Sequence, residues 1–301
     1  MSFAAQVAIP PALAEIAARV NERIAACLDA NAERWAALDA ELAAPLASLR
    51  ALVMAGGKRL RPSFCYWAFV GLGGSGEDPS VIHAGAALEL LHTFALVHDD
   101  VMDGSPMRHG IEAVHVEHHR RHSRAAWREN RGRFGDGVAI LVGDLAFVYC
   151  DRFLTSAAPA ARRVFDEMRL EVNVGQYLDL IGTARRSGDP GLARRICQYK
   201  SGKYTIERPL HLGAALAAPT ASRRWPGGCR PTGCPSGKPS GCATTCSECS
   251  VTPLSPASPS EMTCERASRR CSTPSPGRLR SEPTGGSWSA ASAPQTWGRP
   301  R

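Results

Sequence analysis

Apolar residues recur at three- and four-residue spacing along most of the first 218 residues. In the stretch LAEIAARVNERIAACL (13–28), this spacing places Leu, Ile and Val on one side of a helix, as in an amphipathic helix that packs against a core. The same spacing recurs in segments 80–103, 137–154, 161–180 and 191–217. Period-two alternation of Val, Ile and Thr is absent, so the pattern predicts an all-α bundle over residues 1–218.

Glycine and proline divide this helical pattern. The chain is helix-forming from Pro11 to about Met54, and Ser80 stands where the cap of a long apolar helix is expected. Several segments are apolar nearly all round, which places them inside a large bundle. Breaks are expected near 55–57, 72–79, 104–110, 131–137 and 187–191.

Composition changes sharply near residue 218. Residues 1–218 carry 25 basic and 24 acidic residues, whereas residues 219–301 carry 11 basic and 4 acidic residues, 13 of the 22 prolines and 7 of the 11 cysteines. A segment so poor in large apolar residues does not bury enough surface to offset its conformational entropy. We therefore expect a helical domain over 1–218 and a disordered tail over 219–301.

The front part offers little reason to expect a nucleic acid or a membrane as partner. Its charge is nearly balanced. No run reaches the roughly 18 apolar residues that a spanning helix needs, and the N-terminus lacks a signal-peptide pattern. We expect no integral membrane segment and a cytoplasmic location. The four scattered cysteines of the front part fit buried reduced thiols: Cys27, Cys65, Cys150 and Cys197.

The stretch HDDVMD carries the strongest chemical signal. Asp99 and Asp103 are four residues apart on one predicted helix face, and Asp100 flanks them. Carboxylates without neighbouring His or Cys ligands favour Mg²⁺, which is usually shared with substrate phosphates. The alternative for this motif alone is a solvated acidic helix end.

Basic clusters lie elsewhere in the chain. GGKRLRP offers Lys58, Arg59 and Arg61 as a compact cationic patch for phosphate, although a basic loop is the plainer alternative. Arg108 follows the aspartates, and YKSGKYT adds Lys200 and Lys203. Separate acidic and basic clusters suit a polyphosphate bridged by a metal ion.

Two further motifs are weak when taken alone. His92 shares the helix of the aspartates, where a satisfied core histidine is the plainer interpretation. GQYLD places Gln176 and Asp179 three residues apart on another predicted helix.

Five stretches together resemble the trans-type isoprenyl diphosphate synthases, the polyprenyl synthetase family. They cover about residues 50–217 in the order of the family: GGKRLRP, LELLHTFALVHDDVMDGSPMRHG, GDLAF, GQYLDL and KSGKYTIERPLHLGAAL. The resemblance implies an all-α isoprenoid-synthase bundle, truncated here at about residue 218. It also implies condensation of isopentenyl diphosphate with an allylic diphosphate, and a possible homodimer.

The resemblance also implies residue roles. Asp99, Asp100 and Asp103 would bind Mg²⁺ and the allylic diphosphate, which Lys200 and Arg108 would also hold. The diphosphate of isopentenyl diphosphate would be held by Lys58, Arg61 and His92. Gln176 and Asp179 are further candidates for substrate binding.

Two positions bear on affinity and product length. His109 stands where the family usually has a second arginine, which weakens the expected grip on isopentenyl diphosphate unless His109 is protonated. Phe94 lies five residues before Asp99 and is followed by Ala95. A large ring followed by a small residue resembles the C20-producing members, in which the ring forms the floor of the chain-length cavity.

The cysteine-rich stretch GCATTCSECS (241–250) raises a different question. Its cysteine spacings match no standard paired zinc pattern. Written in GC-rich codons and translated one base earlier, residues 242–253 become L-R-D-D-L-L-G-V-F-G-D-P, which looks like the second aspartate-rich motif of the family. The same offset gives family-like sequence from 234–241 and 255–272. We therefore expect residues 219–301 to be out of frame.

Three functions remain open at this point. The first is a prenyltransferase that makes a linear isoprenyl diphosphate, impaired here because the second aspartate-rich motif is lost. The second is a terpene cyclase on the same bundle, although GGKRLRP and His92 serve a second diphosphate that a cyclase does not need. The third is a non-catalytic diphosphate-binding protein or partner subunit.

Overall fold

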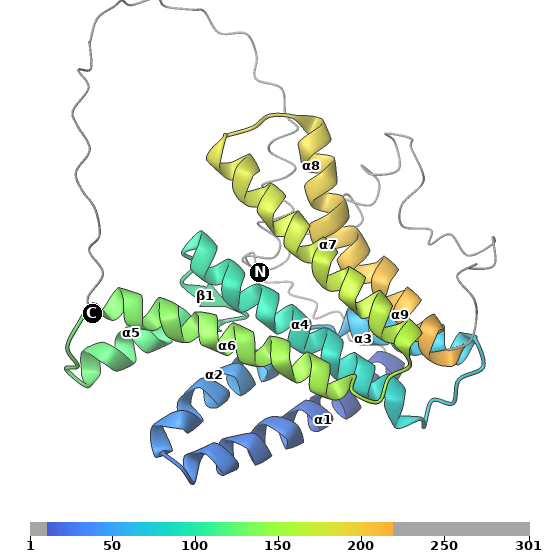
Figure 1. Ribbon diagram of the computed structural model, residues 1–301, viewed down its shortest axis with the longest axis horizontal. Coiled ribbons are helices and arrows are strands. Elements are labelled where there is room, and N and C mark those ends of the chain that lie inside the picture. The colour runs from blue at the N-terminus through green and yellow to red at the C-terminus, as the bar shows by residue number, and fades with distance from the viewer. Residues whose placement is uncertain (1–10, 219–301) are drawn as a thin grey trace, which may run out of the picture.

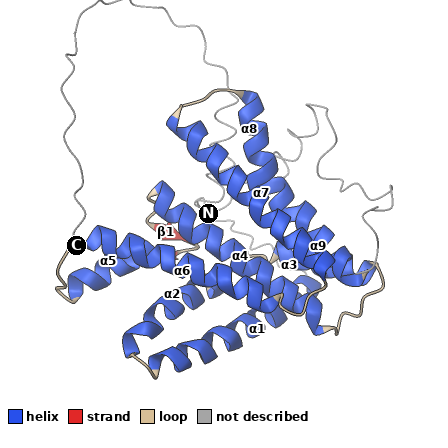
Figure 2. Cartoon of the chain, viewed as in Figure 1, coloured by secondary structure: helices blue, strands red, loops and turns tan. Residues whose placement is uncertain are grey.

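The computed structural model describes residues 11–218 and consists almost entirely of helices (Figures 1 and 2). The expectations for residues 219–301 lie outside the described residues. The elements in chain order are α1 (Pro11–Ala36), the 3₁₀ turn η1 (Ala40–Leu42), α2 (Ala43–Met54), α3 (Leu60–Gly71), α4 (Pro79–Asp103), β1 (Met107–Arg108), β2 (Ile111–Glu112), α5 (Val114–Arg124), α6 (Arg131–Phe153), α7 (Pro159–Ala184), α8 (Pro190–Ile196), the π-helix η2 (Cys197–Glu207) and α9 (Arg208–Ala217).

The all-α prediction is confirmed for residues 11–218, where the only strands are the two-residue β1 and β2, paired antiparallel. Their register joins Met107 to Glu112 and Arg108 to Ile111. Such a short ribbon contributes little to the hydrophobic core. Its consequence is local, because it turns the chain back after α4 and returns Arg108 to the end of that helix.

Helix α4 is the centre of the bundle and contacts α1, α2, α3, α5, α6 and α9 (Figure 1). Most of its residues from Val81 to Leu91 are buried on every side, which explains why this segment is apolar all round. By length and composition, α4 could cross a membrane, but 72% of its apolar window is buried inside the bundle. Packing against neighbouring helices accounts for its apolar character.

The start of α4 differs from the sequence prediction. Asp78, not Ser80, caps α4, because its carboxylate accepts a hydrogen bond from the Ser80 backbone N–H at 2.8 Å, while Pro79 takes the first helical position. The helix-forming stretch from Pro11 to about Met54 folds as α1 and α2, with η1 between them, where the Asp39 side chain caps η1.

The expected break at 131–137 is wrong. Helix α6 begins at Arg131, where the Asn130 side chain accepts a hydrogen bond from the Arg133 N–H. It continues without interruption through the three glycines of 131–137. A Cβ on Gly135 would overlap the His119 ring and the His115 backbone of α5. This glycine lets α5 and α6 approach closely, so it serves packing within a helix.

A similar close approach joins α3 and α9. A Cβ on Gly213 of α9 would overlap the backbone carbonyl of Cys65 in α3, and neither backbone can move without separating the helices. The contact fixes α9, and with it η2, against the front of the bundle.

We predict that Gly213→Ala destabilises the chain by roughly 1–3 kcal/mol, because overpacking a close contact displaces backbone. Gly137→Ala is the matched control, since a Cβ there has no neighbour within 4 Å and alanine is the better helix former by up to about 1 kcal/mol. Urea unfolding of the two variants measures the difference. Equal midpoints would contradict the proposed contact.

Candidate active site at the end of helix α4

The three aspartates occupy the last turn of α4 in different environments. Asp99 is 8% exposed and Asp100 is 1% exposed, whereas Asp103 lies in solvent at the final helical position. The helix ends there because Gly104 adopts a left-handed conformation (φ 63°), which glycine tolerates without steric cost. Two carboxylates are therefore buried next to one another and need compensation.

Arg108 compensates Asp100. The arginine is 1% exposed, and its Nε donates to Asp100 Oδ1 at 2.9 Å, with a second hydrogen bond from its Nη2 to the same oxygen. Its Nη2 also lies 3.6 Å from Asp99 Oδ2. Burial nevertheless raises the pKa of Asp100 to about 6, against the lowering effect of Arg108. The other oxygen, Oδ2, is buried without a hydrogen-bond partner among the described residues.

Asp99 is compensated from the opposite side by residues of α7 and η2. Lys200 Nζ donates to Asp99 Oδ1 and to Asp179 Oδ2, both at 3.0 Å, and Gln176 Nε2 donates to the same Asp99 oxygen at 2.7 Å. The two carboxylates raise the pKa of Lys200 even though its burial acts in the opposite direction. Gln176 and Lys200, which lie 77 and 101 residues after Asp99 in the chain, thus both donate to the same Asp99 oxygen.

The glycine of the GQYLD motif explains how Lys200 reaches this point. A Cβ on Gly175 would stand 2.6 Å from the Lys200 backbone nitrogen and 2.9 Å from its Cα. Only glycine lets η2 approach α7 this closely. The π-helical winding of Cys197–Glu207 is a rare geometry that occurs often at functional sites, and here it carries Lys200 next to Gln176 and Asp179.

The GGKRLRP loop does not form the single cationic patch expected from its sequence. Lys58 is exposed and Arg61 is half-buried, but Arg59 is only 6% exposed. Arg59 donates from Nη1 to Glu89 Oε2 of α4 at 2.8 Å and from Nε to Asn21 Oδ1 at 2.9 Å. Removing one partner of such a buried pair typically costs about 3–5 kcal/mol, so Arg59 anchors the loop to the bundle.

Arg61 connects this loop to the π-helix. Its Nη2 donates to Thr205 Oγ1 at 2.9 Å, and its guanidinium carbon lies 4.4 Å from the centre of the Tyr204 ring. Its Nε is buried without a hydrogen-bond partner among residues 11–218. The Tyr204 hydroxyl in turn lies 3.5 Å from His92 Nδ1. Arg61 and His92 therefore contact the same element that carries Lys200.

His92 and His109 are both uncharged near neutral pH. Burial lowers the pKa of His92 well below its ordinary value, and the charges of Arg61, His109, Arg108 and Arg59 lower it further. Burial likewise lowers the pKa of His109, with Arg108 and Arg59 adding to the effect. His109 consequently adds no positive charge where an arginine was expected.

Phe94 of α4 lies between that helix and α6. Its ring centre is 4.7 Å from that of His98 and 4.9 Å from that of Phe147 of α6. Ala95 beside it is half-buried. The ring is therefore part of a small aromatic cluster one and a half turns below Asp99.

The donor set fits a hard cation. Asp100 Oδ2 is a buried oxygen with no partner within the described part, and Asp103 presents a further carboxylate to solvent. No three His, Cys, Asp or Glu side chains among residues 11–218 are already gathered as a metal site. Lys200 and Arg108 contact one oxygen each of Asp99 and Asp100.

Sequence reasoning missed Glu89, Tyr204, Thr205 and Glu171. Glu171 of α7 is buried and accepts hydrogen bonds from Arg208 at 2.6 and 2.7 Å and from Lys203. Lys203 belongs to η2, the same element that carries Lys200. For Glu89 the available signal was an acidic residue in an apolar helical segment, since a buried carboxylate requires a cationic partner. The identity of each partner depends on tertiary contacts.

Residues 11–218 thus form an all-α bundle in which two adjacent carboxylates at one helix end are opposed by Lys200 and Arg108. The sequence profile of the family described as "Polyprenyl synthetase" matches residues 45–228. The chain belongs to the polyprenyl synthetase family, and the resemblance found in the sequence is confirmed.

Three relatives illustrate the similarity. A geranylfarnesyl diphosphate synthase of Aeropyrum pernix is 29% identical over 55% of this chain and 50% of its own length. The large subunit 1 of a heterodimeric chloroplast geranylgeranyl pyrophosphate synthase of Arabidopsis thaliana is 32% identical over 45% of this chain and 32% of its own. A crystal structure of Corynebacterium glutamicum geranylgeranyl pyrophosphate synthase, complexed with isoprenyl diphosphate and magnesium, has a TM-score of 0.64 and 33% identity, covering 68% of this chain and 60% of that one. The chain thus spans half or less of the length of these two curated relatives.

We predict that the stability of the fold decreases as pH falls below about 6.5. Burial lowers the folded-state pKa of six histidines, so below about pH 6.5 the unfolded chain binds more protons at these residues than the folded chain does. Lowering the pH therefore favours the unfolded state. Asp100 acts in the opposite sense, because its raised pKa lets the folded state hold a proton between about pH 4 and 6. The six histidines outnumber it: His83, His92, His109, His115, His118 and His211.

Urea midpoints at pH 7.5 and pH 5.5 test this expectation. The midpoint should be lower at pH 5.5, and His118→Gln should reduce the difference. A midpoint that is unchanged or higher at pH 5.5 would show that the buried histidines do not control acid stability.

Proposed function

We propose that the frame-corrected protein condenses isopentenyl diphosphate with an allylic diphosphate to make a linear isoprenyl diphosphate. The observation that carries this proposal is the arrangement at the end of α4, where Lys200 and Arg108 lie within hydrogen-bond distance of Asp99 and Asp100. Cations and carboxylates that face one another at one point suit a diphosphate whose charge must be balanced as it leaves.

The proposed chemistry begins with breakage of the allylic carbon–oxygen bond, whose electron pair leaves with diphosphate. Lys200 and Arg108 would bind that diphosphate and stabilise its charge. Asp99, Asp100 and Asp103 would hold Mg²⁺, which when bound supplies further neutralisation of the leaving group. The double bond of isopentenyl diphosphate then attacks the allylic cation. Apolar helices around the site would keep water away from that cation.

The second substrate would bind on the side of the GGKRLRP loop. Lys58 is exposed there, and the Nε of Arg61, near His92 and Tyr204, has no hydrogen-bond partner in the part of the chain that the structure describes. Gln176 and Asp179 would orient Lys200, since Gln176 donates to the same Asp99 oxygen as Lys200 and Asp179 accepts a hydrogen bond from Lys200 directly. Because His109 would be neutral, this site would carry one positive charge fewer than it would with the arginine that is usual in the family at this position.

We also propose that the chain as written is impaired, because the offset from residue 219 removes the second aspartate-rich motif. Mg²⁺ held at the acidic end of α4 would then neutralise a diphosphate from one side only. Retained diphosphate binding without turnover is the second candidate function, and the presence of Lys200 and Arg108 beside the first aspartate cluster favours it. A homodimer remains part of the proposal, supported by half-exposed Ile140, Leu141 and Val148 on α6.

The prediction is tested with two proteins, the 301-residue chain and one whose reading frame is shifted at codon 218 or 219. Each is assayed with Mg²⁺, isopentenyl diphosphate and a short allylic diphosphate. We expect turnover from the corrected protein alone, and we expect Asp99→Ala in that protein to remove most of it while circular dichroism stays helical. Comparable turnover from both chains would refute the impairment, and near-wild-type turnover by Asp99→Ala would refute the site.

Product length is proposed to be C20, with the Phe94 ring as the floor. Phe94→Ala in the corrected protein should extend products beyond C20, because the ring between α4 and α6 is removed. Phe147→Ala, its stacking partner on α6, is the comparison variant. Chromatography of the products measures the length, and an unchanged distribution in Phe94→Ala would mean that another residue forms the floor.

A further inference from the structure

The turn between α5 and α6 is the most basic segment of the described chain. Residues 120–133 hold six arginines and one acidic residue, Glu129, whereas residues 1–218 as a whole are nearly neutral. Figure 1 shows this turn at an edge of the molecule, beyond the ends of both helices. It takes no part in the site at the end of α4.

Within the described part of the chain, two of these arginines have acidic partners and four do not. Arg120 pairs with Glu112, and Arg121 Nη2 lies 2.5 Å from Glu41 Oε2. The remaining four side chains are exposed and have no carboxylate partner among residues 11–218: Arg124, Arg128, Arg131 and Arg133.

Folding does not explain all four arginines. Basic residues in the last turn of α5 complement the negative end of that helix, which accounts for Arg124. Arg131 and Arg133, however, occupy the first turn of α6, where no acidic residue is present and positive charge is unfavourable. Their placement opposes helix stability and points to an external anionic partner.

An aromatic side chain lies among these charges. Trp127 is 41% exposed, and its ring packs edge-on against Phe134 with the centroids 5.2 Å apart. The His122 ring packs against both aromatic rings, and its Nε2 donates a hydrogen bond to the Arg128 backbone carbonyl oxygen at 2.8 Å. The turn is therefore an ordered platform that presents a tryptophan edge.

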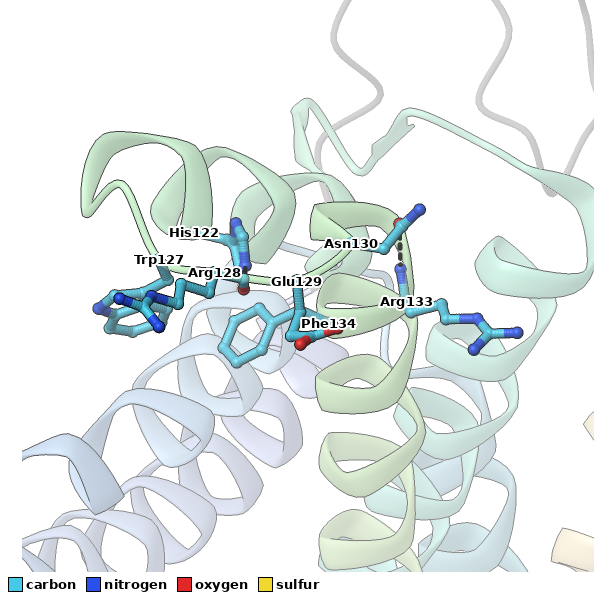
Figure 3. A pocket seen from close by; sticks show the side chains of 7 residues that line it. All are labelled: His122, Trp127, Arg128, Glu129, Asn130, Arg133 and Phe134. Carbon is cyan, nitrogen blue, oxygen red and sulfur yellow. Dashed lines mark hydrogen bonds between the residues drawn. The ribbon is translucent and has the colours of Figure 1, made fainter.

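The platform surrounds a cavity of about 710 Å³, lined by His122, Trp127, Arg128, Glu129, Asn130, Arg133 and Phe134. Figure 3 shows Arg128 beside Trp127, whereas Arg133 points away on the other side of Phe134. Because the two guanidinium groups diverge, they do not converge on one small anion. Diverging cations around an exposed indole fit an extended anionic surface.

We propose that this turn docks on the surface of an anionic lipid bilayer. Clusters of four or more basic residues are attracted to acidic phospholipid headgroups, and tryptophan favours the boundary between headgroups and acyl chains. A single indole on a protruding turn suits a flat bilayer better than a single-stranded nucleic acid, which is usually bound along a groove with several stacking aromatics.

The test measures partition of the full 301-residue chain onto vesicles by co-sedimentation. One set of vesicles is pure phosphatidylcholine and the other contains phosphatidylserine. We expect binding to the anionic vesicles only, weakened by salt. Replacing the four unpaired arginines by serine should reduce partition by at least about tenfold, and Trp127→Ala should reduce it by about threefold.

The matched control replaces four exposed arginines near the α7–α8 turn, at another edge of the molecule (Figure 1): Arg185, Arg186, Arg194 and Arg195. This control keeps the net charge of the chain equal to that of the test variant. We expect it to retain partition within about twofold. An equal loss in both quadruple variants would overturn the proposal, because total charge would then explain the binding.

Two further measurements can contradict the assignment. Brominated lipids should quench less fluorescence in Trp127→Phe than in the wild type, and equal quenching would show that the indole does not reach the bilayer. Tighter binding of single-stranded DNA than of vesicles, lost in the same arginine variant, would assign the surface to nucleic acid instead.

Discussion

The buried charge at the end of α4 is the constraint on which the rest of the site depends. Asp99 and Asp100 are adjacent, and both lie below the surface. Carboxylates in such a place require cationic or hydrogen-bonding partners. The fold supplies them from two directions, with Arg108 carried back by the β1–β2 ribbon and Lys200 carried in by η2. The ribbon and the π-helix thus position the two cations that compensate the buried carboxylates.

A second layer of ion pairs holds the elements that carry these cations. Arg59 and Glu89 tie the loop before α3 to α4. Glu171 of α7 pairs with Lys203 inside the π-helix and with Arg208, the first residue of α9. Arg61 spans the two regions through Thr205 and Tyr204. The proposed binding regions for the two diphosphates are therefore connected through η2. A shift of η2 would move Lys200 of the first region and would also displace Arg61 of the second.

Glycine has two different functions in this chain, and the local sequence does not separate them. Gly104 ends α4 in a left-handed conformation, as its position after an acidic helix end indicates. Gly135 and Gly175 instead lie inside helices, where the absence of a Cβ allows another backbone to come close. The sequence predicted a break at the first of these because glycine normally weakens a helix. The neighbouring helix overrides that preference.

The sequence by itself determined the all-α class, the acidic end of one helix and the membership of the polyprenyl synthetase family. These features are local or compositional, since helical periodicity and the HDDVMD cluster lie within single segments. The tertiary structure alone decided that Arg59 is an anchor instead of a phosphate ligand, and that Arg61 contacts Thr205, 144 residues away. It also brought Lys200 to Asp99 through the space left by Gly175. Such pairings depend on which helices touch, and no pattern within one segment encodes that contact.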